Sequence, residues 1–585
     1  MENKSNPLEL DGEIENLPFK RKVFKGINEV IFFCALFVIT LALFIAIKPF
    51  YENDDLGIRS GMVAQIIMTV LIGAIVCFGA IQAVSNKLDG KTVVFLIFVV
   101  GIILRIGYML YTPATARQHD TFNSANTGHE AYAWTIFSTG KLPTTNDYQF
   151  YHPPLNAFVQ AYFMHFMDWF SSGLSQLFDL TSYFPNAFLQ GYSSSKLPAG
   201  SEYRYFLYSS NQIISVMYSL ITMVYSLKLV KLFGFKGKIG VLVSAIVVLF
   251  PRNIQFAGML NNDAPSYMFS ILALYMALKW QKQGKKVLNI LLCGLFCGLG
   301  MMAKLGSATI CLPIAGIFIY EFILFIKSFV KDIKDKKINL LKSLKLPLSY
   351  FGFLLICAPI ALWFQVYASQ KFGQQFGFVF GNLNSLLKTD HHSLFERLVI
   401  AFDLKEYFGG VYCAPFITKV DGQIVAYNDY NLFHYQLRSG IFGEFTYWQG
   451  EGIAVLCVIF AYAFCILLAV GVVKSFVTYL NYNKGKNTLF KDSKIINFKD
   501  FLFLFLLMQS QVISEIFFYV KMPYACTMDF RYVMPIISAI ALTAGYVLKI
   551  LNAEGSAFSL KLSKFISLTA IMALTCTSLF YCICI

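Results

Sequence analysis

Charged side chains are scarce in this chain of 585 residues. Asp, Glu, Lys and Arg make up 14% of it, whereas hydrophobic residues make up 57% and the mean hydropathy is +0.59. A typical soluble domain carries about 25% charged residues. The composition therefore excludes a single soluble domain and predicts an integral membrane protein that crosses the bilayer many times.

Motifs for nucleotide binding are also missing. No Gly-rich phosphate loop and no dinucleotide-binding fingerprint follows any plausible strand, although an enzyme that takes ATP or a nucleotide sugar would be expected to contain one. No motif for RNA or DNA binding is present either. The net charge of +15 is explained by Lys and Arg in short loops beside membrane spans, where they face anionic lipid.

Long apolar runs recur along the chain. A helix needs about 20 apolar residues to cross a hydrocarbon core of roughly 30 Å, and about thirteen runs approach this length. They cover residues 30–47, 62–84, 92–110, 205–230, 239–256, 264–280, 287–303, 305–326, 346–367, 452–473, 501–520, 532–548 and 565–585. The predicted fold class is an all-α polytopic membrane protein.

The distribution of basic residues predicts the orientation. The first run follows an acidic stretch and lacks a small-residue cleavage pattern, so it is expected to stay as an anchor with a cytoplasmic amino terminus. We divide the chain into a basic cytoplasmic segment (1–29), two additional spans (30–91), a core (92–550) and a last span (551–585). The long segments 111–204 and 368–451 are then extracytoplasmic, and long ordered loops commonly carry function.

The first of these outer segments is rich in residues that can perform chemistry. Its aromatic and apolar residues are spaced as in amphipathic helices at a membrane interface, one around residues 131–137 and a second beginning at Pro153-Pro154-Leu155. We therefore expect the segment to be ordered. The candidate residues are Arg117, His119, Asp120, His129, Glu130, Asp147 and His152.

Several motifs in order resemble the GT-C superfamily of membrane glycosyltransferases, in particular its family 39 branch of protein O-mannosyltransferases and aminoarabinose transferases. The resemblance covers about residues 92 to 550, and the order of the motifs is more specific than any one of them. They are Leu104-Arg105, Arg117-Gln118-His119-Asp120, Gly128-His129-Glu130, Gly140-Lys141-Leu142-Pro143, His152-Pro153-Pro154-Leu155, Asn261-Asn262-Asp263, the stretch from Gly298 to Lys304, and Asp529-Phe530-Arg531 with the following Tyr-Val-Met-Pro.

The resemblance implies a GT-C-like bundle with outer juxtamembrane helices. It also implies transfer of a sugar from a polyprenyl-phosphate carrier to a protein, lipid or glycan acceptor on the outer face, with inversion. An attacking hydroxyl needs a base, for which Asp120 is the first candidate. The leaving phosphate needs cations or polar groups, and the candidates are Arg531, Lys304, Arg252 and His152. The remaining matched positions, expected to contact substrate, are Arg117, His129, Asp263 and Asp529.

The identity of the base stays open at this point. Many relatives have two adjacent acidic residues, whereas here His119 precedes a lone Asp120 and Glu130 follows ten positions later. Glu130 could cooperate in catalysis or only hold His129. His119 is a third candidate for the catalytic group.

Each candidate also has a plainer interpretation. Asp120 and Asp263 could cap helices, and His152 could end the loop by binding a backbone carbonyl. Lys304 could extend to the interface from between two apolar runs, and Arg531 could be an interfacial anchor.

Two other classes of protein would have similar composition. A transporter or lipid flippase would also be polytopic and basic, but paired half-repeats and broken spans with midplane charges would be expected. A non-catalytic scaffold could have kept the fold. No cofactor is predicted with certainty, and the His, Asp and Glu residues could hold a divalent metal, although their spacing matches no closed set of ligands.

Overall fold

The fold is helical throughout its membrane-spanning part. The computed structural model describes residues 27–48, 62–115, 120–123, 125–179, 189–192, 195–336, 340–377, 388–399, 418–420, 423–426, 430–443, 451–483 and 497–583. The N-terminal half contains α1 (Ile27–Ile47), α2 (Met62–Val84), α3 (Gly90–Tyr111), α4 (His129–Thr139), η4 (Tyr148–Tyr151), α5 (Leu155–Leu177), α7 (Glu202–Ser209), α8 (Gln212–Lys231), α9 (Gly237–Leu249), α10 (Pro251–Gln255), α11 (Asp263–Lys282) and α12 (Val287–Ala303).

The C-terminal half continues with longer helices. It contains η5 (Leu305–Ile310), α13 (Cys311–Lys334), α14 (Leu340–Phe372), α15 (Leu394–Leu398), β1 (Thr418–Val420), β2 (Gln423–Ala426), α17 (Leu432–Phe442), α18 (Glu451–Asn483), α19 (Phe498–Lys521), η7 (Ala525–Met528), η8 (Phe530–Val533), α20 (Ile536–Glu554) and α21 (Ala557–Ile583). The antiparallel strands β1 and β2 are the one departure from the all-α prediction among the described residues. Asp421 and Gly422 separate them in the sequence, a pair that favours a tight hairpin.

Every predicted apolar run coincides with helix. Within the described residues, ten helical stretches are long and apolar enough to cross a membrane. The other three predicted runs form α9 and α12, which are shorter, and α11, whose first turn contains Asp263, Pro265 and Ser266. The run 239–256 is split between α9 and α10, because Pro251 lacks an N–H group and begins the second helix. The polytopic membrane architecture is confirmed.

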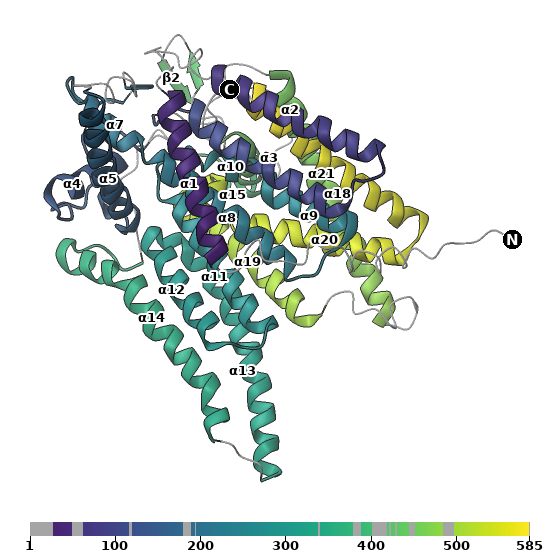
Figure 1. Ribbon diagram of the computed structural model, residues 1–585. Helices are drawn as coiled ribbons and strands as arrows, with labels where there is room; N and C mark the ends of the chain where they lie inside the picture. Colours follow the sequence, from purple (N-terminus) through teal and green to yellow (C-terminus); the bar gives the residue numbers. More distant parts are fainter. Residues whose placement is uncertain are drawn as a thin grey trace.

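The core of the bundle is built around α11. This helix packs between α8 and α12, and α12 in turn packs along α14. Elsewhere α18 lies along α21, and α13 lies along α19 (Figure 1). Gly294 and Gly298 allow the close approach of α12 to α14, since a Cβ at either position would lie within 3.0 Å of α14 atoms.

The helices α4 and α5 of the segment 111–204 lie together at one end of the bundle, beside α7. The C-terminal end of α13 projects far from them (Figure 1). Helix α5 is amphipathic as predicted: Met164 and Met167 are buried, whereas Tyr162 and Trp169 are 71% exposed. An apolar exposed face of this kind suits a helix at a membrane interface.

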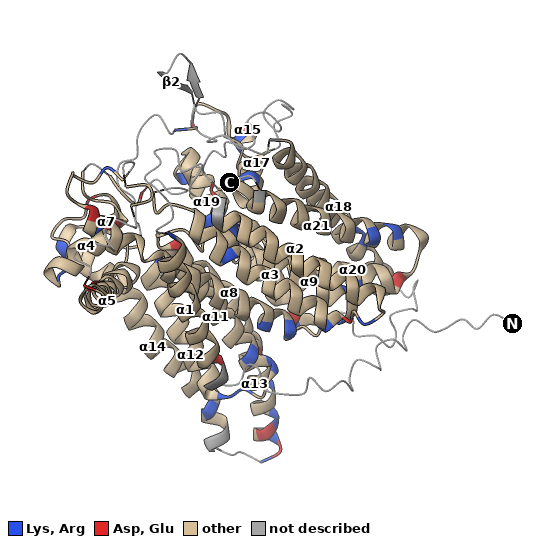
Figure 2. Cartoon of the chain, turned by 45° about the horizontal axis from the view of Figure 1, so that its top comes forward, with Lys and Arg blue, Asp and Glu red and all other residues tan. Residues whose placement is uncertain are grey.

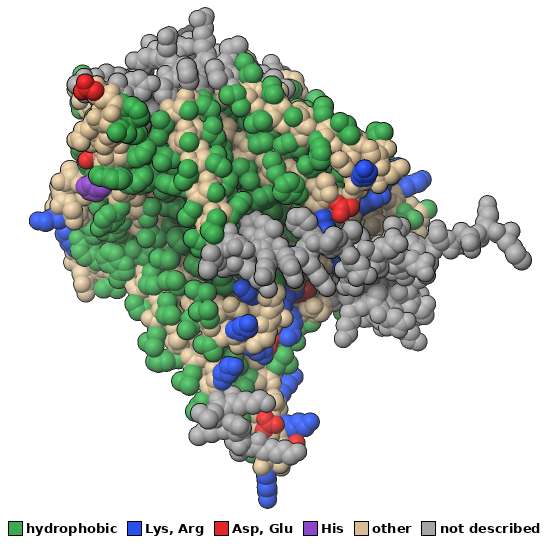
Figure 3. Space-filling model, in the orientation of Figure 1, with side chains coloured by type: hydrophobic (Ala, Val, Ile, Leu, Met, Phe, Trp, Pro, Cys, Tyr) green, Lys and Arg blue, Asp and Glu red, His purple; other side chains and the backbone are tan. Residues whose placement is uncertain are grey.

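The surface agrees with a membrane environment. The helix shafts are almost free of charged residues, and Lys and Arg gather near helix ends (Figure 2). Hydrophobic side chains cover much of the visible face of the bundle (Figure 3). Exposed apolar residues such as Ile81, Phe95 and Ile319 can be accommodated by lipid.

We expect a cysteine placed at Ser138, at the exposed end of α4, to react with a membrane-impermeant maleimide in intact cells. A cysteine at Asp335, in the exposed turn after α13, should react only after the membrane is opened. The physical reason is the excess of Lys around the α13–α14 turn, which favours the cytoplasmic side. Labelling is measured by mass spectrometry against the unsubstituted protein, and the reverse pattern would refute the proposed orientation.

Candidate functional site

The segment containing Asp120 folds back onto the first turn of α4. The N–H of His129 donates to the Asp120 carbonyl (3.0 Å), and the N–H of Glu130 donates to the Thr121 carbonyl (3.0 Å). These bonds satisfy two of the N–H groups that the start of a helix leaves unpaired. Only glycine fits at position 128, because a Cβ there would lie 2.5 Å from the Thr121 carbonyl oxygen. The sequence Gly128-His129-Glu130 therefore fixes the backbone of Asp120.

The Asp120 carboxylate remains accessible. Its side chain is 21% exposed, and Oδ2 lies 3.9 Å from Nε2 of His129. The side-chain amide of Gln149 donates weakly to the same oxygen at 3.5 Å. These contacts orient the carboxylate without covering it, so an incoming hydroxyl group could reach it.

Glu130, by contrast, is tied to a cation. The Arg204 guanidinium at the start of α7 binds both carboxylate oxygens at 2.6 Å, and its Nη2 also donates to Asn126 at 2.7 Å. The same guanidinium lies over the Trp134 ring, 4.9 Å from its centroid. Burial raises the pKa of Glu130, and the hydrogen bonds and charge of Arg204 oppose that rise. This geometry gives Glu130 the task of joining α4 to α7.

Two histidines lie side by side next to Asp120. The rings of His129 and His152 are nearly parallel, with centroids 5.9 Å apart, and the Tyr132 hydroxyl donates to the His152 carbonyl at 3.2 Å. Burial lowers the pKa of His129 to about 4, although nearby Asp120 opposes the shift, and it lowers the pKa of His152 well below its usual value. Both imidazoles are therefore neutral near pH 7 and can act as hydrogen-bonding groups.

The turn before Asp263 is held by polar side chains from other helices. Gln212 donates to the carbonyl of Gly258 (3.0 Å), Ser215 to that of Met259 (2.5 Å), and Gln160 to that of Leu260 (2.8 Å). Asn156 donates to the Asn261 carbonyl and to the Asn262 side chain, both at 3.2 Å. Because Asn156 and Gln160 belong to α5, these bonds dock the outer segment onto the start of α11.

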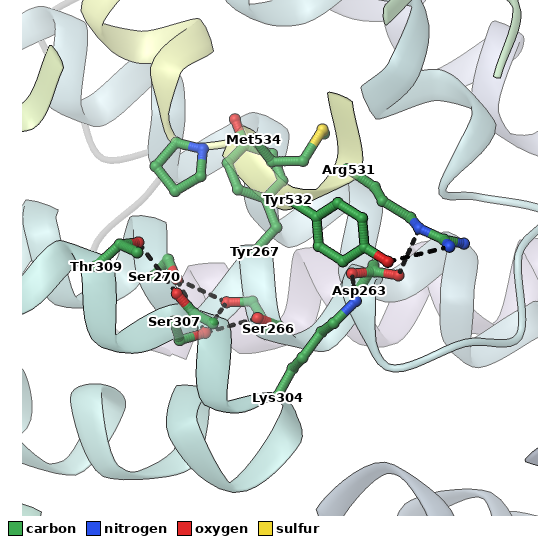
Figure 4. A pocket seen from close by; sticks show the side chains of 12 residues that line it. Asp263, Ser266, Tyr267, Ser270, Lys304, Ser307, Thr309, Arg531, Tyr532 and Met534 are labelled. Atoms are coloured by element: carbon green, nitrogen blue, oxygen red, sulfur yellow. Dashed lines mark hydrogen bonds and ion pairs between the residues drawn. The ribbon is translucent and has the colours of Figure 1, made fainter. Parts of the chain in front are cut away.

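Two cationic side chains lie near the Asp263 carboxylate. Nζ of Lys304, at the C-terminal end of α12, lies 2.5 Å from Oδ1, and Nε of Arg531, in η8, lies 3.9 Å from Oδ2. In Figure 4 both side chains point toward Asp263, and the Tyr532 ring lies between them, with Lys304 Nζ 4.5 Å from its centroid. A small cavity of about 30 Å³ continues from this cluster and is lined by hydroxyl groups, among them those of Ser266, Ser270 and Ser307. We call Asp263, Lys304 and Arg531 the cation cluster.

Arg252 and Asp529 form a separate buried ion pair. Nη2 of Arg252 lies 2.7 Å from Oδ1 of Asp529, and the two side chains are 1% and 0% exposed. The same Oδ1 accepts the N–H of Arg531 at 2.7 Å, while Nη1 of Arg252 donates to Gln255 at 2.6 Å. The pair thus fixes the backbone of η8, which carries Arg531.

Asp120 and the cation cluster both lie near His129. Burial is the main cause of the lowered pKa of His129; the charges of Asp120 and Asp263 oppose the shift, and those of Lys304 and Arg531 add to it. A second cavity, which is apolar and about 520 Å³ in volume, lies between α5, α12 and α14. It is lined by Leu155, Phe158, Leu299, Met302, Pro359, Ile360 and Trp363. Met302 lies two positions before Lys304 in the sequence, and Leu155 adjoins Asn156, which binds the turn before Asp263.

Two candidates from the sequence, Arg117 and His119, lie outside the described residues. Within the described part of the chain, no three or more His, Cys, Asp or Glu side chains are arranged to hold a metal ion. The described candidates Asp120, His129, His152, Asp263, Lys304 and Arg531 come together. Glu130, Arg252 and Asp529 support the backbone around them, and Asp147 is exposed at the start of η4.

Sequence reasoning missed the polar side chains that organise the site. Arg204 was identified only as the residue before a predicted span. A single Arg next to a segment rich in carboxylates could have indicated an ion pair. Gln149, Asn156, Gln160 and Gln212 gave no signal of their own, because single amides in apolar helices have no motif. Asn156, Gln160 and Gln212 bind backbone carbonyls far away in the sequence, and Gln149 binds the Asp120 carboxylate.

Residues 208–363 match the family model described as dolichyl-phosphate-mannose-protein mannosyltransferase. The match confirms the resemblance to GT-C glycosyltransferases over these residues and supports glycosyltransferase as the class of enzyme. No curated protein matches the chain.

Among solved structures, the chain is similar to the oligosaccharyltransferase of Archaeoglobus fulgidus. The apo form is 13% identical with a TM-score of 0.39, over 83% of this chain and 56% of that one. The complex with Zn and sulfate is 11% identical with a TM-score of 0.35, over 82% and 53%. The chain thus spans about half the length of that enzyme, and TM-scores this low do not establish a common fold.

The buried histidines predict a loss of stability in acid. Because the folded protein favours neutral His129, the unfolded chain binds more protons, and stability falls as the pH decreases from about 6.5 toward about 4. The shift corresponds to about 3 kcal/mol for His129. The loss of stability is measured by thermal unfolding of the protein in detergent at pH 7.5 and at pH 5. His129→Gln should reduce the difference between the two pH values, whereas His391→Gln, at an exposed position, should not. An identical pH dependence in wild type and His129→Gln would contradict the assignment.

Proposed function

We propose that this protein is an inverting glycosyltransferase that moves a sugar from a polyprenyl-phosphate carrier to an acceptor hydroxyl on the extracytoplasmic face. One observation carries the proposal. An accessible carboxylate, Asp120, and a cation cluster beside a small polar cavity both lie near His129, and α5 and α12 also line an apolar cavity. A lipid-linked sugar phosphate needs these three environments together.

Asp120 is the proposed general base. The acceptor hydroxyl gives its proton to Asp120 as its oxygen attacks the anomeric carbon, and the bond between that carbon and the phosphate oxygen breaks on the opposite side. The sugar is thereby inverted, and the polyprenyl phosphate leaves with one more negative charge. A positioned base commonly contributes about 10² to 10⁴ in rate.

The cation cluster is the proposed phosphate site. Negative charge grows on the phosphate as the bond breaks, and pre-positioned cations stabilise it without reorganisation. Arg531 can bind two phosphate oxygens with its planar fork, whereas Lys304 supplies a point charge. Asp263 holds both cations in place before the donor arrives, and neutral His129 and His152 are placed to bind the sugar or the phosphate. The polyprenyl chain would occupy the apolar cavity beside Met302.

The ion pairs of Glu130 and Arg252 support a positioning role for both residues. Glu130 is bound through both oxygens by Arg204, and Arg252 is bound to Asp529 in a fully buried pair. Removing one partner of a buried pair strands the other charge, which costs about 3–5 kcal/mol. Arg117 and His119 remain predicted contributors from the sequence. The sugar and the acceptor, whether protein, lipid or glycan, are left open by this geometry.

Asp120→Asn should lower the turnover number for sugar transfer by about 10² to 10⁴ while donor affinity changes little, because the substitution keeps the shape and removes the proton acceptor. The assay follows radiolabelled sugar from a polyprenyl-phosphate donor in detergent-purified protein. Asp147→Asn, an exposed carboxylate of the same outer segment, is the matched control and should remain active. Full activity of Asp120→Asn would remove Asp120 from the role of base.

Arg531→Lys should reduce donor use by about tenfold to a hundredfold even though the charge is kept, because a charge-assisted contact is worth about 1.5–3 kcal/mol. The comparison uses kcat/KM with a polyprenyl-phosphate sugar. Arg397→Lys, at a buried arginine of α15 that packs on Tyr519, serves as control. The proposed donor would be wrong if the matching nucleotide sugar alone supported transfer, or if Arg531→Lys matched the wild type.

A further inference from the structure

A buried lysine from the first helix contacts the framework of the site. Lys48 directly follows α1 and is only 4% exposed. Its Nζ donates to Oε1 of Gln212 at 2.5 Å and to the carbonyl of Thr112 at 3.4 Å, and it lies 5.2 Å from the centroid of the Phe44 ring. None of these contacts has a part in the chemistry described above. Helix α1 was expected to be only an addition to the core.

The partner of Lys48 joins the two segments that carry the site's carboxylates. The Gln212 amide donates to the carbonyl of Thr112 at 2.9 Å and to that of Gly258 at 3.0 Å. The segment leading to Asp120 starts at Thr112, and the turn leading to Asp263 starts at Gly258. One glutamine therefore holds the first residue of both segments.

Lys48 sets the direction of this amide. A glutamine side chain has an acceptor oxygen at one end and two donor hydrogens at the other. When Oε1 accepts from Lys48, both hydrogens of Nε2 face the two backbone carbonyls. Burial lowers the pKa of Lys48 to about 7, but its amino group has N–H donors in either protonation state, so the contact is kept across neutral pH.

The packing at this point leaves little room for another arrangement. A Cβ at Gly258 would lie 2.8 Å from the Tyr108 ring and 3.5 Å from Cβ of Thr112. The Thr112 and Gly258 segments are therefore in direct contact, and a flipped or displaced Gln212 amide would shift both. Such a shift would act on the turn that leads to Asp263 and on Thr112, which precedes Asp120 in the sequence.

We infer that Lys48 is a positioning residue, through which α1 fixes the Gln212 amide and with it the segments that carry Asp120 and Asp263. The inference rests on the proposed function, in which Asp120 is the base. According to this inference, α1 contributes to the activity of the enzyme and is not only a membrane anchor.

A double-mutant cycle in the transfer assay tests the inference. Lys48→Met keeps the length of the side chain and removes its donors, so it should lower kcat by about tenfold in the wild-type background, since small misplacements of a catalytic group are costly. In the Asp120→Asn background the same change should have an effect of less than about twofold, because the group it positions is already disabled. Lys48→Arg should restore much of the activity, and Lys87→Met, at an exposed site between α2 and α3, should leave it unchanged. Equal effects in both backgrounds would overturn the inference.

Hydrogen–deuterium exchange supplies a readout that does not depend on activity. Lys48→Met should speed exchange in residues 112–128 and 258–262 and leave the α13–α14 hairpin unchanged. If Lys48→Met does not yield folded protein, Gln212→Asn, whose shorter amide cannot reach both carbonyls, should give the same pattern. Unchanged exchange in both segments refutes the positioning role even if the proposed function holds. Faster exchange together with a fully active Asp120→Asn enzyme would refute the proposed function but would still support the positioning role of Lys48.

Discussion

The site depends on a break in the helices of an apolar bundle. Between α10 and α11 the chain leaves helical geometry, and the carbonyl groups of residues 258–261 lose their helical partners. Such groups are costly in a low-dielectric interior unless other donors bind them. Gln212, Ser215, Gln160 and Asn156 supply those donors. The break can therefore be kept in one conformation, and it places Asp263 at the inner end of a polar cluster.

The same requirement connects the outer segment to the membrane core. Two of the four donors belong to α5, whose apolar residues also line the large cavity beside α12 and α14. Docking of α5 thus satisfies backbone carbonyls on one side and lines an apolar cavity on the other. The His152 ring is placed beside His129 by the turn that begins this helix. The packing of α5 against the bundle therefore forms a polar surface and an apolar surface together.

Four carboxylates near the site have different tasks because they have different partners. Glu130 and Asp529 each face an arginine in a buried pair, and Asp263 holds Lys304. Asp120 accepts a long hydrogen bond from Gln149, lies 3.9 Å from His129 and stays 21% exposed. A carboxylate in a buried ion pair is held in place by its cation, whereas an accessible one can take a proton from a substrate. The surroundings of each carboxylate, and not its residue type, distinguish these four side chains.

The sequence by itself determined the membrane class, the apolar runs and the amphipathic helix α5, because hydrophobic length and periodicity are local properties of the chain. It also indicated Asp120, His129, Asp263, Lys304 and Arg531 through the order of motifs. Only the tertiary structure decided which carboxylate meets which cation. The partners are 74 residues apart for Glu130 and Arg204, 277 for Arg252 and Asp529, and 41 for Asp263 and Lys304. Pairing at such distances follows from the packing of whole helices, and no local pattern of residues encodes it.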